Sequence, residues 1–310
     1  MSGIIRVENL SKKFGKASVL KDVNFCVEKG EVFGYLGPNG AGKTTTIRIL
    51  LGILRPTSGQ AMLFGEDVNK DTEEVKRKVG FVLEDQRLYE RLSAYDNLEY
   101  YARIYGVPKN IMGESIKELL NFTGLWVNKD KLVGKFSKGM KQKLSIARSL
   151  VHDPEVLFYD EPTLGLDPEM QVVIKDLVIS LVKDRKKTIF LNSHNLAEVQ
   201  KICSKVAILQ KGEILACNSL KKLQSENNKP ELEVTIGDMS NNRLNEIKAL
   251  NFVINCQRED NKLIIKMTNY TRTQELLRFL IQKNVKIREV KEVTKTLEDV
   301  YLELIKEPEE

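Results

Sequence analysis

The feature that most limits how this chain can fold is the eight-residue run Gly37 to Thr44, Gly-Pro-Asn-Gly-Ala-Gly-Lys-Thr. The apolar run Val32 to Leu36 precedes it as a predicted buried strand, and Thr45 to Leu51 follows it as a predicted helix. Glycines let the backbone curl so that successive N–H groups point inward, and the helix start adds partial positive charge. The pattern is that of a phosphate-binding loop (P-loop), and it is favoured over an ordinary glycine-rich turn because both flanking elements fit.

The P-loop supplies a cation and a metal ligand as well as its backbone. Lys43 is expected to reach the outer phosphates of a nucleotide, and the Thr44 hydroxyl is expected to bind Mg²⁺. The residues predicted to bind the nucleotide here are Gly37, Pro38, Asn39, Gly40, Ala41, Gly42, Lys43, Thr44 and Thr45.

Two acids follow a second predicted strand, Val156 to Tyr159. Adjacent strand residues point to opposite faces, so we expect Asp160 to reach the Mg²⁺ shell and Glu161 to aim at the attacking water. Glu161 is therefore a candidate general base, while the metal and Lys43 would stabilise charge on the γ-phosphate. A pair of solvated loop acids is disfavoured because the apolar run buries this strand.

The order of predicted elements divides the chain in two. Residues 1–222 alternate β-branched runs with helical patterns, which predicts an α/β domain around a largely parallel sheet. A polar linker at 223–230 leads to a smaller domain at 231–310, with the order β-α-β-β-α-β and one further helix. That order suits a ferredoxin-like α+β domain, with its last strand predicted at 285–290.

Composition narrows the cellular setting. The apolar runs are far shorter than the roughly 20 residues of a membrane-spanning helix, and no secretory signal pattern is present, so a cytosolic chain is expected. The net charge of +6 arises from 49 basic and 43 acidic residues mixed along the chain, so no nucleic-acid partner is expected.

The segment Phe136 to Lys143, Phe-Ser-Lys-Gly-Met-Lys-Gln-Lys, opens a predicted helix before the acidic strand. Here the chain resembles the ABC ATPase family, whose signature reads Leu-Ser-Gly-Gly-Gln. Ser137 and Gly139 match it, and the other three positions differ. A hydroxyl and an unpaired backbone N–H at a helix start can donate hydrogen bonds to the γ-phosphate of a nucleotide bound to a second subunit. Without the flanking motifs, a simple helix cap would be the better interpretation.

Further segments resemble other motifs of this family, and they follow one another along the chain in the order typical of the family. Pro162 to Pro168 resembles the D-loop, which implies that Asp167 communicates across a subunit interface. His194 resembles the switch histidine, which contacts the γ-phosphate and orients the water of Glu161. The other histidine, His152, is interpreted as a surface residue at a helix end without a role.

Two assignments leave alternatives open. Phe14 occupies the place of the aromatic that stacks on adenine in this family, although it could instead pack against the sheet edge. The Q-loop position holds Glu84 where the family has glutamine. A carboxylate can still give an oxygen to Mg²⁺, so Glu84 is the candidate and Gln86 the alternative.

The resemblance covers roughly residues 4 to 220 and implies a P-loop NTPase of the ABC ATPase type with a helical subdomain at about 86–150. It also implies ATP and Mg²⁺ as cofactors and two ATP molecules sandwiched by a homodimer or by this chain and a paralogous subunit. Thr296 to Tyr301 resembles the end of ATP-binding subunits of drug, antibiotic or peptide exporters. That implies an ATPase on the inner face of the cell membrane, bound to a separate integral membrane permease through the region around Glu84 to Leu98.

Two rival functions are weighed against this one. A soluble ABC-type ATPase acting on ribosomes or DNA is disfavoured, because such proteins typically carry two ATPase units or long coiled coils. A binding protein without turnover is disfavoured because the residues that the chemistry needs are all present: Lys43, Asp160, Glu161 and His194.

Overall fold

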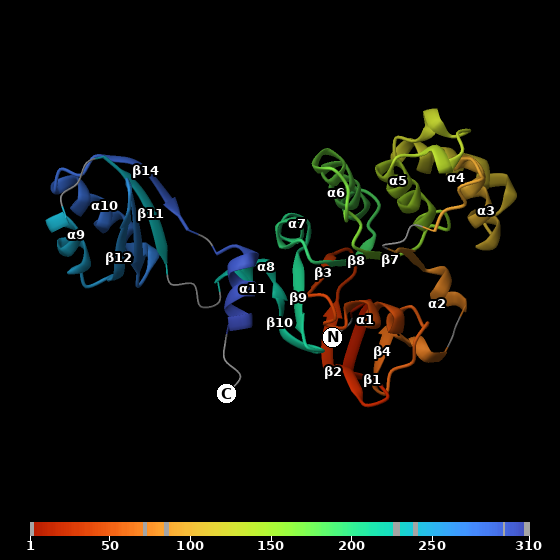
Figure 1. Ribbon diagram of the computed structural model, residues 1–310, viewed down its shortest axis with the longest axis horizontal. Helices are drawn as coiled ribbons and strands as arrows, with labels where there is room; N and C mark the ends of the chain where they lie inside the picture. Colours follow the sequence, from red (N-terminus) through yellow and green to blue (C-terminus); the bar gives the residue numbers. More distant parts are fainter. Residues whose placement is uncertain are drawn as a thin grey trace. The chain divides into compact units, whose positions relative to one another are not determined.

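The computed structural model describes residues 3–70, 73–83, 87–225, 230–237, 241–293 and 295–306. The chain forms two compact units, 1–220 and 221–310, which Figure 1 traces from red to blue along the sequence. Within the described ranges, no helix has the length and apolar character needed to cross a bilayer.

A six-stranded sheet forms the centre of the first unit from β3 (Val32–Leu36), β6 (Val79–Val82), β7 (Val156–Asp160), β8 (Thr188–Ser193), β9 (Lys205–Gln210) and β10 (Glu213–Ser219). The strand order is β10-β9-β3-β8-β7-β6, and all pairs are parallel except β9 with β10. β3, β7 and β8 are buried at every position, which explains their continuous apolar sequences. The predicted largely parallel α/β sheet is confirmed.

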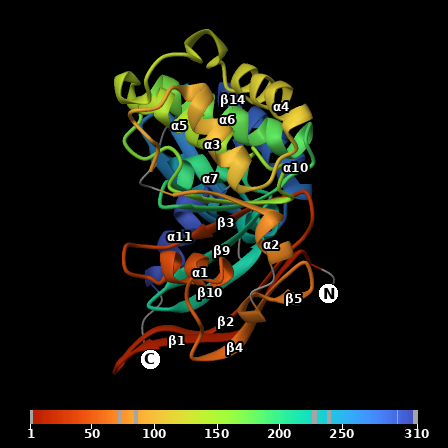
Figure 2. The same ribbon diagram turned by 90° about the vertical axis from the view of Figure 1, so that its right-hand side faces the viewer.

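A second, antiparallel sheet consists of β1 (Ile5–Phe14), β2 (Ala17–Val27), β4 (Ser58–Leu63) and β5 (Glu66–Asp67). Helix α1 (Lys43–Leu50) lies between this sheet and the central one (Figures 1 and 2). Ile47 of α1 is buried in a core that both sheets share, where the rings of Phe25 and Phe33 stack 5.4 Å apart. This packing on both sides fixes the start of α1 at the end of β3.

The helices α3 (Ala94–Ile104), α4 (Lys109–Phe122) and α5 (Lys138–Ser149) follow β6 in sequence and pack against one another (Figure 2). Ser93 caps α3 in a capping box with Asp96. The remaining helices before residue 226 are α2 (Glu73–Arg77), α6 (Pro168–Lys183), α7 (Leu196–Ile202) and α8 (Leu220–Ser225), with 3₁₀ turns at Val68–Lys70, Trp126–Asn128 and Val133–Lys135.

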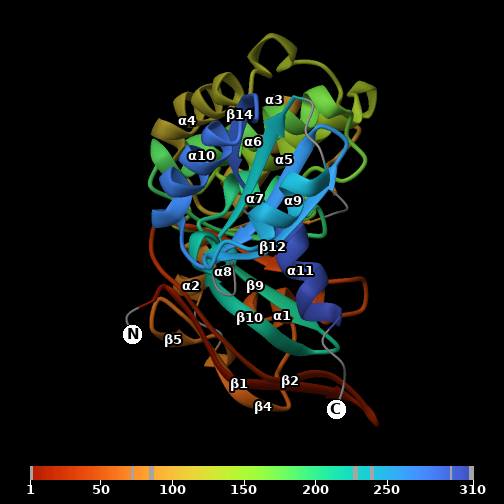
Figure 3. The same cartoon turned by 90° about the vertical axis from the view of Figure 1, so that its left-hand side faces the viewer.

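The second unit contains the strands β11 (Glu231–Ile236), β12 (Val253–Glu259), β13 (Lys262–Met267) and β14 (Ile287–Glu292), the helices α9 (Asn241–Lys248), α10 (Thr273–Gln282) and α11 (Leu297–Lys306), and a 3₁₀ turn at Tyr270–Arg272. Its sheet has the order β12-β13-β11-β14 with every pair antiparallel. Helices α9 and α10 pack on one face of the sheet (Figure 3), where Ile247 and Leu276 join the buried strand residues. The predicted ferredoxin-like arrangement is confirmed.

The last strand begins two residues later than the predicted 285–290. Val285 is buried, and its N–H donates to the Leu280 carbonyl at 3.0 Å, so it closes the end of α10. In the sequence, a buried apolar residue in a turn cannot be told from the first apolar residue of an alternating strand. The prediction therefore placed the start of the strand at Val285.

Candidate functional site

The P-loop joins the end of β3 to the start of α1. A Cβ atom at Gly37 would lie 2.2 Å from the Leu209 carbonyl oxygen, so only glycine allows the backbone to pass β9 this closely. Gly42 has a φ of 110° and caps α1 without a side-chain hydrogen bond. The first N–H groups of α1 therefore have no capping side chain, and they border the concave surface that the loop forms.

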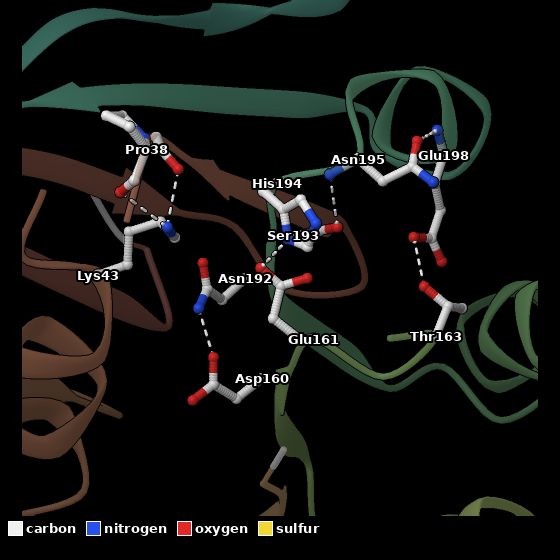
Figure 4. A network of polar contacts seen from close by, with 11 residues as sticks. Pro38, Lys43, Asp160, Glu161, Thr163, Asn192, Ser193, His194, Asn195 and Glu198 are labelled. Carbon is white, nitrogen blue, oxygen red and sulfur yellow. Dashed lines mark hydrogen bonds and ion pairs between the residues drawn. The ribbon is translucent and has the colours of Figure 1, made fainter. Parts of the chain in front are cut away.

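Lys43 is buried at the first position of α1. Its Nζ donates to the carbonyl oxygens of Gly37 at 2.7 Å and Pro38 at 3.1 Å, which holds the ammonium over the loop (Figure 4). Burial lowers the pKa of Lys43, while the negative charges of Glu161 and Asp160 oppose that shift. The charges of Asp160 and Glu161 are therefore close enough to act on the ammonium group of Lys43.

The two acids stand at the end of β7. Asp160 is the last residue of the strand and is buried, and its Oδ1 accepts a short hydrogen bond from Nδ2 of Asn192 on β8. Glu161 lies just beyond the strand with a φ of 50°, and its N–H donates to the Asn192 carbonyl at 2.9 Å. The direction of the Glu161 side chain is thus set by a left-handed turn, not by strand alternation as the sequence analysis assumed.

His194 follows the end of β8 and meets Glu161. The distance from His194 Nδ1 to Glu161 Oε1 is 2.8 Å, with the imidazole exposed and the carboxylate largely buried (Figure 4). The predicted base and the predicted switch histidine are therefore in direct contact.

A cavity of about 240 Å³ opens over the P-loop. Its lining comes from four segments of the first unit: Val19, Asn39, Gly40, Gly42, Lys43, Thr44, Thr45, Asp160, Glu161 and Asn192. The fold thus brings the predicted phosphate loop, the predicted metal acid and the predicted base around one space. A polar cavity with a buried cation and two carboxylates suits a phosphate ester with a bound cation.

The predicted signature residues do not line this cavity. Ser137 caps α5 by accepting a hydrogen bond from the N–H of Met140 at 3.2 Å. Gly139 is buried against α6, where a Cβ would lie 2.6 Å from Met170 Cγ. Asp167 likewise caps α6, accepting from the N–H of Met170 at 2.9 Å. In this chain, Ser137 and Asp167 cap helix starts, Gly139 packs on α6, and all three lie outside the P-loop cavity.

The remaining predicted residues divide as follows. Phe14, at the end of β1, is 50% exposed, with Lys12 Nζ over its ring at 4.9 Å from the centroid. Glu84 and Gln86 lie outside the described residues. His152 is less exposed than the sequence predicts: it is half-buried, its ring stacks on Tyr105 with centroids 3.7 Å apart, and its Nε2 lies 3.0 Å from the Val79 carbonyl oxygen.

Sequence reasoning missed two residues beside the acids, Asn192 and Glu198. Asn192 is a polar residue in an otherwise apolar strand, and this was the available signal. Glu198 lies on α7, four residues after His194, and its Oε2 accepts from the Thr163 hydroxyl at 2.7 Å (Figure 4). Burial, and to a smaller degree the charge of Glu161, raise the pKa of Glu198, while the Thr163 hydrogen bond opposes the shift. This contact ties the segment after Glu161 to the helix after His194.

Replacing Thr163 with Val should lower the free energy of unfolding by about 1–3 kcal/mol, because the substitution removes a donor from a largely buried carboxylate. Urea unfolding at neutral pH measures this change. An unaltered unfolding free energy would show that the contact does not contribute to stability.

The matched variant Glu198→Gln should change the pH dependence of stability. The pKa of Glu198 is raised in the folded chain, so the folded state binds the proton more tightly than the unfolded state. Its contribution to stability is therefore present below the unfolded pKa and is lost as pH rises through the folded pKa. Urea unfolding measured between the unfolded and the folded pKa of Glu198 should show that the free energy of unfolding of the Gln variant falls less with rising pH than that of the unchanged chain.

Comparison with known proteins gives two family matches and relatives that match most or all of the chain. The family described as ABC transporter matches residues 20–164, and the one described as ATP-binding protein DrrA1-3-like, C-terminal domain, matches residues 219–305. The bacitracin transport ATP-binding protein BcrA of Bacillus licheniformis is 38% identical over 306 residues, covering 98% of this chain and 98% of that protein. A fluoroquinolones export ATP-binding protein of Mycobacterium tuberculosis is 40% identical over 224 residues, covering 71% of this chain and 72% of that protein.

Solved structures share the fold of the first unit. An ATP-binding subunit of an ABC transporter superimposes with a TM-score of 0.65 at 30% identity, covering 72% of this chain and 92% of that chain. A dimeric ATP-binding cassette in a post-hydrolysis state bound to ADP and Pi superimposes with a TM-score of 0.63 at 26% identity, covering 70% of this chain and 98% of that chain. This chain therefore belongs to the ATP-binding proteins of the ABC transporter family, which are ATPases.

Proposed function

We propose that two ATP-binding subunits, either two copies of this chain or this chain and a paralogue, close around ATP so that each nucleotide touches both. One observation carries the proposal: the cavity gathers Lys43, Asp160 and Glu161, whereas Ser137 and Gly139 stand outside it. A related cassette forms a dimer with ADP and Pi, which supports the proposal. Mixing two variants that are each inactive, one in the P-loop and one in the signature segment, tests this arrangement, because only a composite site would regain turnover.

Within each site, Glu161 acts as the general base and polarises a water in line with the γ-phosphate. His194 contacts one oxygen of the Glu161 carboxylate at 2.8 Å, which leaves the second oxygen to accept the proton. Lys43 and the N–H groups of the P-loop stabilise the charge that develops on the transferring phosphoryl group. Phe14, which is half exposed at the end of β1, supports the adenine by stacking.

The residues of the cavity also fit Mg²⁺. This ion is usually held by one or two carboxylates together with phosphates and waters, and Thr44 and Asp160 offer oxygen atoms in the cavity. Across the described ranges, no group of three or more His, Cys, Asp or Glu side chains could hold a metal ion. Thr44 and Asp160 would hold the metal, which neutralises phosphate charge when bound.

An apolar groove on the first unit supports a membrane partner. Two adjoining cavities of about 310 and 250 Å³ share the side chains of Ile53, Phe81 and Tyr105. Ile53 is 69% exposed and Ile104, in the same groove, is 60% exposed. Exposed apolar surface of this kind marks an interaction site. We assign it to a short amphipathic helix on the cytoplasmic side of a separate membrane permease, which would hold this chain on the inner face of the membrane.

The direction of transport is also part of the proposal. Two relatives carry the names bacitracin transport and fluoroquinolones export. Because the similarity to the first of these extends over 98% of both chains, we propose that this chain powers an exporter of drug-like or peptide antibiotic molecules.

Ile53→Glu tests the partner assignment. The substitution places a charge in the apolar groove without touching the nucleotide cavity, so it should weaken co-purification of the permease by about tenfold or more. ATP hydrolysis by the isolated chain should be unchanged. The control is Val127→Glu in the turn Trp126–Asn128, because Val127 is 89% exposed and lies outside the groove. Equal recovery of the permease with both variants would exclude this groove as its docking site.

A further inference from the structure

Asn192 on β8 holds both acids of the site. Its Nδ2 donates to Asp160 Oδ1 (Figure 4). Its main-chain carbonyl accepts from the N–H of Glu161 at 2.9 Å. The residue is 2% exposed, and it lines the P-loop cavity. One residue thus bonds to the predicted metal acid through its side chain and to the predicted base through its backbone.

The other end of the same amide has no partner among the described residues. Oδ1 of Asn192 is buried, and no hydrogen bond reaches it from any described residue. A buried acceptor without a partner is unfavourable, because it has lost the hydrogen bonds that water would give it. Rotating the amide by half a turn does not solve the problem, because it would place the amide oxygen against the Asp160 carboxylate. The orientation is therefore fixed by Asp160, and the acceptor without a partner belongs to a side chain that lines the cavity.

We propose that Asn192 is a positioning residue of the ATP site: its Nδ2 orients Asp160, and its Oδ1 accepts a hydrogen bond from a water bound to Mg²⁺. This inference rests on the proposed Mg²⁺ site at Asp160. Water on a divalent cation is a strong donor, and an amide oxygen receives it without adding a second negative charge beside Asp160. A carboxylate at position 192 would lose the donor to Asp160 and add like-charge repulsion.

Two substitutions at position 192 test the inference. Asn192→Leu keeps the approximate volume and removes both polar ends, and Asn192→Ser ends one bond short of Asp160 while keeping a polar side chain. Both should lower the affinity of the ATP-loaded chain for Mn²⁺, measured by electron paramagnetic resonance, by about tenfold or more. Affinity for metal-free ATP, measured by calorimetry in EDTA, should change by less than about twofold, because the P-loop is untouched.

The control at an unrelated strand position is Asn218→Leu on β10, which should leave both affinities unchanged. Unchanged Mn²⁺ affinity in both position-192 variants would overturn the inference, and so would an equal loss of affinity for metal-free ATP, since that would indicate general distortion of the site. Asp160→Asn distinguishes a failure of the proposed Mg²⁺ site from a failure of the role proposed for Asn192. If it lowers Mn²⁺ affinity and the position-192 variants do not, only the role of Asn192 fails. If it also leaves Mn²⁺ affinity unchanged, the proposed metal site fails.

Discussion

Replacing Glu161 with Gln is expected to slow ATP turnover by about 10²- to 10⁴-fold while leaving ATP binding intact. Gln has the shape of Glu, and its amide oxygen can keep the contact that His194 makes with the carboxylate at 2.8 Å. It cannot take a proton from water. Lys43 and the P-loop remain to bind the triphosphate. Phosphate release measures turnover, and calorimetry measures ATP affinity.

The same variant should accumulate as an ATP-bound dimer. If hydrolysis is what opens the two subunits, a chain that binds ATP without cleaving it should elute at the size of a dimer with ATP and Mg²⁺ and at a smaller size with ADP. Glu155→Gln is a suitable control, because Glu155 precedes β7 at its other end and pairs with Lys29 at the surface. Normal turnover in the Glu161 variant would refute its assignment as the base.

The site residues that could be predicted from sequence are those that lie next to one another along the chain. The P-loop lies within eight consecutive residues, and the two acids follow directly after an apolar strand, so local pattern was enough to place them. The fold class was predictable for the same reason, since buried parallel strands leave continuous apolar runs.

What the sequence could not predict depends on contacts between distant segments. Asn192 bonds to Asp160 across 32 positions, and Glu198 bonds to Thr163 across 35, with no fixed spacing to reveal either pair. The left-handed turn at Glu161 was also hidden, because a non-glycine residue adopts a φ of 50° only where the surrounding bonds hold it there. The predicted catalytic and interface roles stay predictions.

A large gain in turnover is expected when two inactive variants are combined. Lys43→Ala removes the cation of the P-loop. Gly139→Asp places a carboxylate at the start of α5, where it would repel a phosphate presented by the partner, and the neighbouring atoms belong to the flexible Met170 side chain. Each variant alone should lose turnover by at least about a hundredfold. An equal mixture should regain about a quarter of normal turnover, because half of the dimers are mixed and each has one intact composite site.

The double variant Lys43→Ala/Gly139→Asp, mixed equally with the unchanged chain, gives the reciprocal test. If each site takes its P-loop from one subunit and its signature segment from the other, a mixed dimer has no intact site, and turnover should fall to about a quarter of that of the unchanged chain at the same total protein concentration. If both elements acted within one chain, turnover would fall only to about a half, and the two single variants would show no recovery. The pair of mixtures therefore separates a shared site from a self-contained one, even where each variant alone is equally inactive.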